Sequence, residues 1–229
     1  MRKDLLPANA VLASNRLASH VRTTPLDYSP WFSEQTGARV YLKLENLQHT
    51  GSFKLRGAFN KLLALTDEER RGGCVAASSG NHGAAVAFAM SALDVTGVIF
   101  VPEQTSSTKV AAIRQAGAEV RFFGTDGLDT EVHARQYAAD RGMTYLSPYN
   151  DPDVIAGQGS CGVEIARQLS DVDALFVAVG GGGLVAGSGG FLKSVNPRMS
   201  VLGCQPEASA VMAHSAQVGR ILEMPSART

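Results

Sequence analysis

From residue 39 onward, short hydrophobic runs rich in β-branched residues alternate with longer stretches whose apolar positions recur every three or four residues. The short runs predict strands at Val40–Leu44, Cys74–Ala77, Val98–Val101, Glu119–Phe123, Leu175–Val179 and Val201–Cys204. The longer stretches predict helices at Phe53–Leu65, His82–Leu93, Ser107–Ala116, Leu128–Asp140, Ile155–Leu169, Leu184–Val195 and Ser209–Gly219. Strands that alternate with helices of this length are typical of βαβ units, so the pattern predicts an α/β protein with parallel sheets.

The same alternation predicts how the chain is divided. Residues 70–146 form a compact βαβαβ block, and the strongest glycine-rich loops stand on either side of it. We interpret this block as a small domain inserted into a large domain made of residues 1–69 and 147–229. A cleft between such domains, at the carboxyl ends of parallel strands, is where cofactors tend to bind.

One predicted strand has a distinctive composition. The run Phe176–Val179 is continuously apolar and is bounded by Asp173 and Gly180. Such a run is expected of a strand whose two faces are both covered.

Composition and charge narrow the function classes. The 229 residues include 21 Lys and Arg and 21 Asp and Glu, so no basic excess points to a nucleic-acid or acidic-membrane partner. The three cysteines, Cys74, Cys161 and Cys204, lack metal-ligand spacing, and we interpret them as buried small hydrophobic residues in a reducing compartment. Neither a signal peptide nor a membrane span is predicted, and we expect a cytoplasmic protein.

The first motif with chemical meaning runs from Glu45 to Ala58, ENLQHTGSFKLRGA. A polar turn leads into a helix that begins near Phe53, with Ser52 predicted as its N-cap. Lys54 then lies in the first helical turn, where the helix dipole disfavours a cation. A neutral amine is what Schiff-base formation requires, so a depressed pKa would be functional. The alternative is a surface lysine whose stem lies along the helix.

The second motif, Ser78-Ser79-Gly80-Asn81-His82-Gly83, follows a predicted strand and opens an alanine-rich helix. Backbone N–H groups at a helix start bind anions, which suits a carboxylate, and the Asn81 amide suits a phenolic oxygen. The alternative is an ordinary βα turn capped by Ser or Asn. A serine-hydrolase role for Ser79 and His82 is disfavoured, because no G-x-S-x-G elbow is present and the two are close in sequence.

The third motif is Val179-Gly180-Gly181-Gly182-Gly183-Leu184-Val185-Ala186-Gly187. Four glycines between a strand and a helix allow several amides to converge on one phosphate. A dinucleotide pattern starting at Gly181 is met only weakly, and Glu207 is the nearest acidic candidate for a ribose ligand. The alternative is a flexible structural loop, disfavoured because four glycines cost backbone entropy.

In this order, the three motifs resemble the fold-type II (tryptophan-synthase-β-like) pyridoxal-phosphate enzymes, and most closely the threonine/serine dehydratase and serine racemase group. Thr23-Thr24-Pro25-Leu26 and Ile155-Ala156-Gly157-Gln158-Gly159 extend the resemblance over essentially the whole chain. The resemblance implies two three-layer parallel-sheet domains, pyridoxal 5'-phosphate as cofactor, a small amino-acid substrate and a homodimer.

The resemblance also implies a role for each matching residue. Lys54 would form the Schiff base, and Phe53 would pack beside the pyridine ring. Asn81 would bond the 3' oxygen of the cofactor, and the turn Ser78, Ser79, Gly80, Asn81, His82 would hold the substrate carboxylate. The phosphate would bind to Gly180, Gly181, Gly182, Gly183 and Leu184. Ser79 matches the residue that faces the substrate α-carbon opposite the lysine.

The implied reaction is deamination of L-threonine or L-serine by β-elimination of water, giving a 2-keto acid and ammonia. Lys54 would remove the α-proton. Racemisation and β-replacement on the same scaffold are alternatives, and so is a truncated cofactor-binding protein with little activity. A nucleotide-binding module is a weaker alternative from another class.

The sequence departs from the group in two respects. Relatives continue past Met224–Thr229, and the residue that faces the pyridine nitrogen normally comes from that later part, so we expect an incomplete large domain and no regulatory domain. Gln205 and Val211 stand where some relatives place a glutamate and an aspartate, so we expect no metal site.

Overall fold

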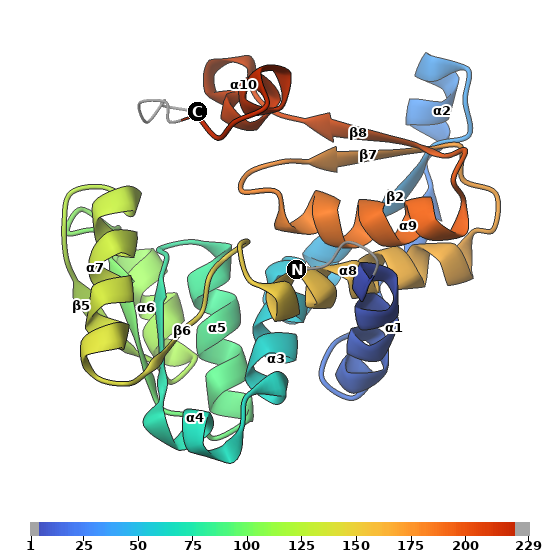
Figure 1. Cartoon of the computed structure of the whole chain (residues 1–229). Coiled ribbons are helices and arrows are strands. Elements are labelled where there is room, and N and C mark those ends of the chain that lie inside the picture. The colour runs from blue at the N-terminus through green and yellow to red at the C-terminus, as the bar shows by residue number, and fades with distance from the viewer. Residues whose placement is uncertain (1–4, 223–229) are drawn as a thin grey trace. The chain divides into compact units, whose positions relative to one another are not determined.

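The computed structural model of the chain describes residues 5–222. Contacts divide it into two compact units, one of residues 15–147 and one of residues 5–14 with 148–222. Helices and parallel strands alternate along the chain, which confirms the predicted α/β class (Figure 1).

A four-stranded parallel sheet organises the Asn15–Ser147 unit, with the strand order β5-β4-β3-β6. Its strands are β3 (Cys74–Ala77), β4 (Gly97–Val101), β5 (Glu119–Phe122) and β6 (Thr144–Tyr145). Three of the four were predicted from hydrophobic runs. The two-residue strand β6 was not, because it is too short to give a periodic signal.

The two faces of this sheet pack into different hydrophobic clusters. Cys74, Ala76, Ile99 and Val101 lie in a cluster with residues of α3 (Lys54–Ala64), α5 (Asn81–Ala92) and α6 (Ser107–Gln115). The intervening residues Val75, Val98 and Phe100 lie in a second cluster with Ala134 and Ala138 of α7 (Gly127–Asp140). Because successive side chains of a strand point to opposite faces, helices cover this sheet on both sides and the continuous apolar runs of β3 and β4 are explained.

Shorter elements precede the sheet in this unit. Strands β1 (Leu26–Tyr28) and β2 (Tyr41–Lys43) form an antiparallel pair, and the short helix α2 (Pro30–Thr36) lies between them in sequence. Helix α4 (Asp67–Gly72) begins with a capping box between Thr66 and Glu69. Helix α1 (Leu6–Leu17), most of which belongs to the other unit, and these short elements lie outside the predicted set, apart from β2.

The second unit contains a smaller parallel sheet of β7 (Ala174–Ala178) and β8 (Ser200–Cys204). Its helices are α8 (Pro152–Gln168), the π-helix η3 (Val185–Gly189), α9 (Gly190–Val195) and α10 (Val211–Val218), with the 3-10 turn η4 (Glu207–Ser209) before α10. Helix α8 and η3 approach closely, since a Cβ on Gly162 would lie 2.7 Å from the Ser188 carbonyl oxygen. The helix predicted at Leu184–Val195 is present as the π-helix η3 followed directly by the α-helix α9.

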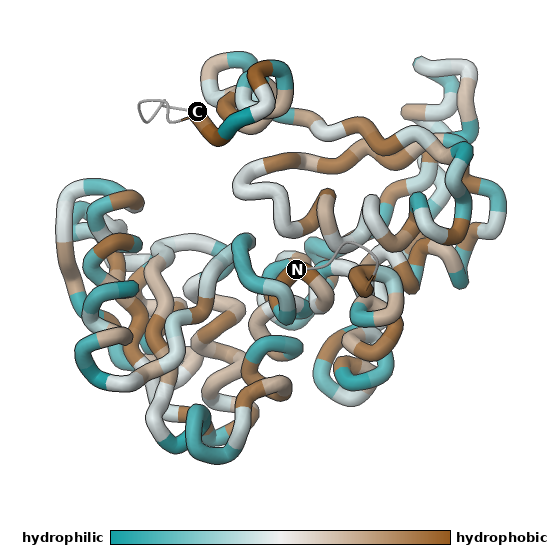
Figure 2. The backbone as a smooth tube through the Cα atoms, viewed as in Figure 1, coloured by the Kyte–Doolittle hydropathy of each residue, from teal (hydrophilic) through white to brown (hydrophobic). Residues whose placement is uncertain are grey.

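The prediction that Phe176–Val179 is covered on both faces is wrong. Val177 is buried, but the neighbouring Phe176 is 70% exposed. Leu202, which pairs with Phe176 in β8, is 40% exposed. Both strands are hydrophobic along much of their length (Figure 2). Within the described residues, the sheet has two strands, and the side chains on one face lack a covering helix.

The cysteine prediction is correct for two of the three residues. Cys74 and Cys161 are buried, whereas Cys204 is exposed, because it lies on the open face of the β7–β8 sheet with Phe176 and Leu202. All three thiols are free.

The predicted domain bounds differ from the contact units at one end. Residues 15–69 belong to the same compact unit as the four-stranded sheet. The division into 1–69 with 147–229 against 70–146 stays a prediction. Among residues 5–222, no helix combines the length and the apolar character that crossing a bilayer requires.

Candidate active site

Lys54 lies in the first turn of α3, as the sequence predicted, and is its first residue, with a half-buried side chain. Its Nζ lies 5.3 Å from the centre of the Phe53 ring. Burial lowers the pKa of this amine from 10.5 to about 8. The neutral form that a Schiff base requires is therefore accessible near neutral pH, and burial is its cause.

The predicted N-cap at Ser52 is wrong. Phe53 occupies the N-cap position with helical backbone angles, and no side chain caps the helix. The Ser52 hydroxyl is buried and has no hydrogen-bond partner among the described residues. The helix start is held by tertiary contacts instead of by a local cap.

Those contacts centre on a buried arginine. Arg56, fully buried, donates hydrogen bonds from Nε and Nη2 to the two carboxylate oxygens of Glu45, each at 2.8 Å. The Thr24 hydroxyl donates to the same carboxylate at 2.6 Å. Three residues from separate segments therefore fix the entry into α3, and sequence reasoning assigned none of them a role.

Gln48 makes a second connection between the same segments. Its side-chain amide donates to the Arg22 carbonyl and accepts from the Arg22 N–H, both at 2.9 Å. Lys43 adds a hydrogen bond from Nζ to the Thr24 carbonyl at 2.7 Å. The motifs TTPL and ENLQ thus pair with each other, which explains why they occur together with Lys54.

The turn Ser78–His82 joins β3 to α5, as predicted, and its N-cap residue is Gly80. Gly80 carries no side chain, so the predicted alternative of a Ser- or Asn-capped turn is not what the structure has. The Ser78 hydroxyl accepts a hydrogen bond from the Gly80 N–H at 3.1 Å. The first N–H groups of the twelve-residue helix α5 carry no side-chain cap, which suits an anion such as a carboxylate.

His82 has a different role from a side-chain ligand. Its imidazole is buried, and Nε2 lies 3.0 Å from the Leu146 carbonyl oxygen, so Nε2 carries the proton and donates. Burial, and to a lesser degree the charge of Lys54, lower the pKa of His82 to about 4. A contribution to substrate binding would come from the backbone N–H of His82, because its ring is held by the end of β6.

The glycine run Gly180–Gly183 joins β7 to η3 in the other unit. Gly182 has a φ of 87°, which residues with a side chain rarely adopt. A Cβ on Gly181 would overlap the ring of Tyr149. A Cβ on Gly183 would lie 3.1 Å from the Tyr149 backbone, so tertiary structure alone accounts for three of the four glycines, and the entropy argument for a ligand does not extend to them. Tyr149 was not singled out in the sequence.

Gly180 is the member of the run that the fold leaves unexplained. It is exposed, its φ is outside the left-handed region, and a Cβ there would meet no atom within 4 Å. A main chain left open beside a helical start is the feature that a phosphate cradle needs. The loop therefore fits the phosphate of the predicted cofactor at this position.

The predicted residues fall into two groups. Lys54, Phe53 and the turn Ser78–His82 belong to one compact unit, where α3 packs on α5 and the Lys54 charge acts on His82. Gly180–Leu184 belong to the other unit. The union of the two groups around one cofactor stays a prediction.

A comparison with protein families decides the ancestry. The sequence profile described as "Pyridoxal-phosphate dependent enzyme" matches residues 17–229. The chain belongs to this family. The predicted family and its cofactor are thereby confirmed.

Individual members of the pyridoxal-phosphate dependent family show the same relation. The chain is 44% identical over 209 residues to the catabolic L-threonine dehydratase TdcB of Escherichia coli strain K12, covering 91% of this chain and 64% of that protein. It is 40% identical over 217 residues to L-threo-3-hydroxyaspartate ammonia-lyase of Saccharomyces cerevisiae, covering 95% of this chain and 67% of that protein.

Solved structures agree. The processed form of threonine deaminase isoform 2 from Solanum lycopersicum matches with a TM-score of 0.93 at 35% identity, over 99% of this chain and 62% of that one. Maize serine racemase matches with a TM-score of 0.92 at 30% identity, over 96% and 67%. These matches confirm the predicted fold type.

The chain spans about two thirds of the length of such relatives. Met224–Thr229, past which relatives were expected to supply the residue facing the pyridine nitrogen, lie outside the described residues. Gln205 accepts a hydrogen bond from the Ala213 N–H at 2.8 Å. The absence of a metal site stays a prediction.

Proposed function

We propose that this chain carries the cofactor and substrate residues of a lyase that deaminates L-threonine or L-serine to a 2-keto acid and ammonia. The observation that carries the proposal is the pairing, in one compact unit, of a lysine whose pKa is about 8 with an uncapped Ser78–His82 turn. The relatives named threonine dehydratase and threonine deaminase support it.

Each residue would contribute a definable step. When bound, the cofactor supplies an electron sink for the pair left behind at the α-carbon. The Lys54 amine would hold the cofactor and take the α-proton, because its neutral form is accessible near neutral pH. The β-hydroxyl would leave as water. Hydrolysis of the carbon–nitrogen bond of the released product would then give the keto acid and ammonia.

The other predicted residues would position the reactants. The N–H groups at the start of α5 would bind the substrate carboxylate, with Ser79 opposite Lys54. Asn81 would bond the cofactor's 3' oxygen, and Phe53 would lie beside its ring. The amides of Gly180–Leu184 would hold the phosphate, and the open main chain at Gly180 supports this.

The test is an assay of keto-acid release by the full chain supplied with pyridoxal phosphate, offered L-threonine, L-serine or L-threo-3-hydroxyaspartate. We expect turnover and a visible absorbance band of lysine-bound cofactor, both abolished in Lys54→Ala. The exposed Lys109 of α6 gives the matched control, so Lys109→Ala keeps both signals.

Other outcomes distinguish the alternatives. Conversion of L-serine to D-serine without keto acid would favour racemisation. The similarity to maize serine racemase is the reason for this measurement. Consumption of added sulfide would favour β-replacement. Absorbance without turnover would indicate a cofactor-binding protein with little activity, and no absorbance at all would refute the proposal.

Location and assembly are also proposals. A cytoplasmic protein is supported by three free thiols, since reducing compartments preserve them. A homodimer is implied by the family resemblance, and light scattering of the purified chain measures it.

A further inference from the structure

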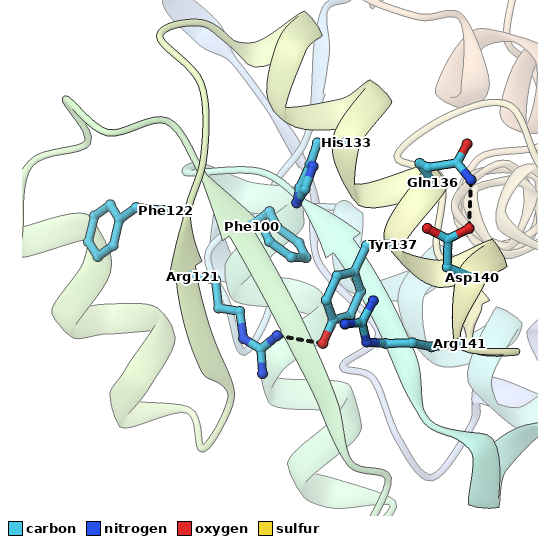
Figure 3. A pocket seen from close by; sticks show the side chains of 8 residues that line it. All are labelled: Phe100, Arg121, Phe122, His133, Gln136, Tyr137, Asp140 and Arg141. Carbon is cyan, nitrogen blue, oxygen red and sulfur yellow. Dashed lines mark hydrogen bonds between the residues drawn. The ribbon is translucent and has the colours of Figure 1, made fainter.

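A cluster of cationic side chains that includes Arg121 and Arg141 lies in the Asn15–Ser147 unit, between strands β4 and β5 and helix α7. It lines a cavity of about 370 Å³ (Figure 3). The lining side chains are Phe100, Arg121, Phe122, His133, Gln136, Tyr137, Asp140 and Arg141. None of them has a role in the proposed active site.

Two guanidinium groups share one aromatic ring in this cavity. The Cζ atoms of Arg121 and Arg141 lie 5.2 and 3.8 Å from the centroid of the Tyr137 ring. Because both distances start from the same point, the two positive groups are no more than 9.0 Å apart. Arg121 also donates to the Tyr137 hydroxyl from Nη1, as Figure 3 shows.

The hydrogen-bonding capacity of these cations is only partly used. Arg121 donates from Nε to Glu119 at 2.6 Å, which leaves Nη2 available. No residue within 5–222 accepts a hydrogen bond from the guanidinium of Arg141, whose contact is the face of Tyr137. A planar fork of donors that stands over a ring and lacks an acceptor is suited to a bidentate oxyanion.

The remaining walls determine the size and the shape of a ligand. His133 stacks on Phe123 with ring centroids 3.6 Å apart and meets the edge of Phe100 at 4.9 Å. The carboxylate of Asp140 also lines the cavity, but it accepts a hydrogen bond from the Gln136 amide at 2.7 Å. Glu119 is thus paired with Arg121, and Asp140 keeps its negative charge but accepts from Gln136, whereas the guanidinium of Arg141 has no acceptor among the described residues.

We propose that this cavity binds a small oxyanion, a carboxylate or a phosphate, through Arg141 and Arg121 above the Tyr137 ring. The alternative for Arg141 is purely structural, because it also caps the C-terminal end of α7, where a cation is favourable. Ligand binding and helix stabilisation predict different results for the same substitution.

The experiment follows the side-chain N–H signals of arginine by NMR in the full chain during titration with inorganic phosphate and, separately, with succinate. Sodium chloride keeps the ionic strength constant, so general screening is held fixed. We expect saturable shifts of the Arg121 and Arg141 signals. Saturation by one anion alone identifies which oxyanion the cavity accepts.

Two variants of α7 make the test decisive. Arg141→Gln should raise the dissociation constant by roughly tenfold or more, since a charge-assisted bidentate contact is lost. Arg135→Gln removes a cation from the same helix outside the cavity, where Arg135 pairs with Glu131, and should leave binding unchanged. Equal effects of the two variants, or shifts that never saturate, would overturn the proposal, and thermal unfolding of each variant verifies its fold.

Discussion

Arg56 and Glu45 form a bidentate ion pair on either side, in sequence, of the candidate Schiff-base lysine, with two N–O distances of 2.8 Å. Glu45 precedes the Thr-Gly-Ser turn and Arg56 follows Lys54 by two residues, so the pair closes the segment that carries the lysine. Arg56 is fully buried, and Glu45 is largely so. The position of Lys54 therefore depends on two residues that need touch neither cofactor nor substrate.

Glu45→Gln is expected to destabilise the fold by roughly 3 kcal/mol, because it leaves the buried Arg56 charge without a counter-ion. Urea unfolding measures the change. The exposed pair of Arg121 and Glu119 is the control, and Glu119→Gln should cost less than about 1 kcal/mol. Equal losses of unfolding free energy in the two variants would contradict the prediction that burial makes the Arg56–Glu45 pair more important for stability.

The reactivity of Lys54 is expected to follow a pKa of about 8. At pH 7 about one Lys54 amine in ten is then neutral, against roughly one in 3,000 for a lysine at 10.5. The rate of trapping by pyridoxal phosphate and borohydride at Lys54 should rise with pH and level off above about pH 9. Peptide mass spectrometry measures it site by site, and a rate still climbing at pH 10 would contradict the lowered pKa.

Gly180 and Gly181 make a matched pair for the phosphate loop. Gly180→Ala should leave the unfolding midpoint unchanged, because a Cβ there meets nothing within 4 Å, yet weaken binding of pyridoxal phosphate. Gly181→Ala should lower stability by about 1–3 kcal/mol even without cofactor, because its Cβ would overlap the Tyr149 ring. Unchanged cofactor affinity in Gly180→Ala would argue against a phosphate at that position.

His82 is expected to make the fold sensitive to acid. Its pKa is about 4 in the folded chain and 6.5 as a free side chain, so the unfolded chain takes up a proton first as pH falls. The contribution of neutral His82 to the free energy of unfolding is fully present above pH 6.5 and is lost as pH falls towards 4. The loss is roughly 2–3 kcal/mol at pH 4.5. Urea unfolding at pH 7 and 4.5 should show this component in the native chain and not in His82→Gln. An equal loss in both proteins would mean that other groups cause it.

Local pattern was sufficient for much of the fold. The continuous apolar runs of β3 and β4 identify buried parallel strands, and the alanine-rich composition of α5 identifies the crossover helix between them, without reference to distant residues. Lys54, the Ser78–His82 turn and the glycine run were found in the same way, because each depends on residue types at fixed spacing between a strand and a helix. The family comparison confirms the family that these motifs predicted, and the role of each residue stays a prediction.

Burial and long-range pairing required the tertiary structure. The pKa of Lys54 falls because other segments cover its amine, and the Ser52 cap predicted from local spacing is absent. The Glu45–Arg56 pair, the His82–Leu146 hydrogen bond and the Tyr149–Gly181 contact each join residues from different elements. A sequence specifies where strands and helices form through neighbouring residues, but the free energy of a charge or a ring depends on what packs against it, and only the folded chain decides that.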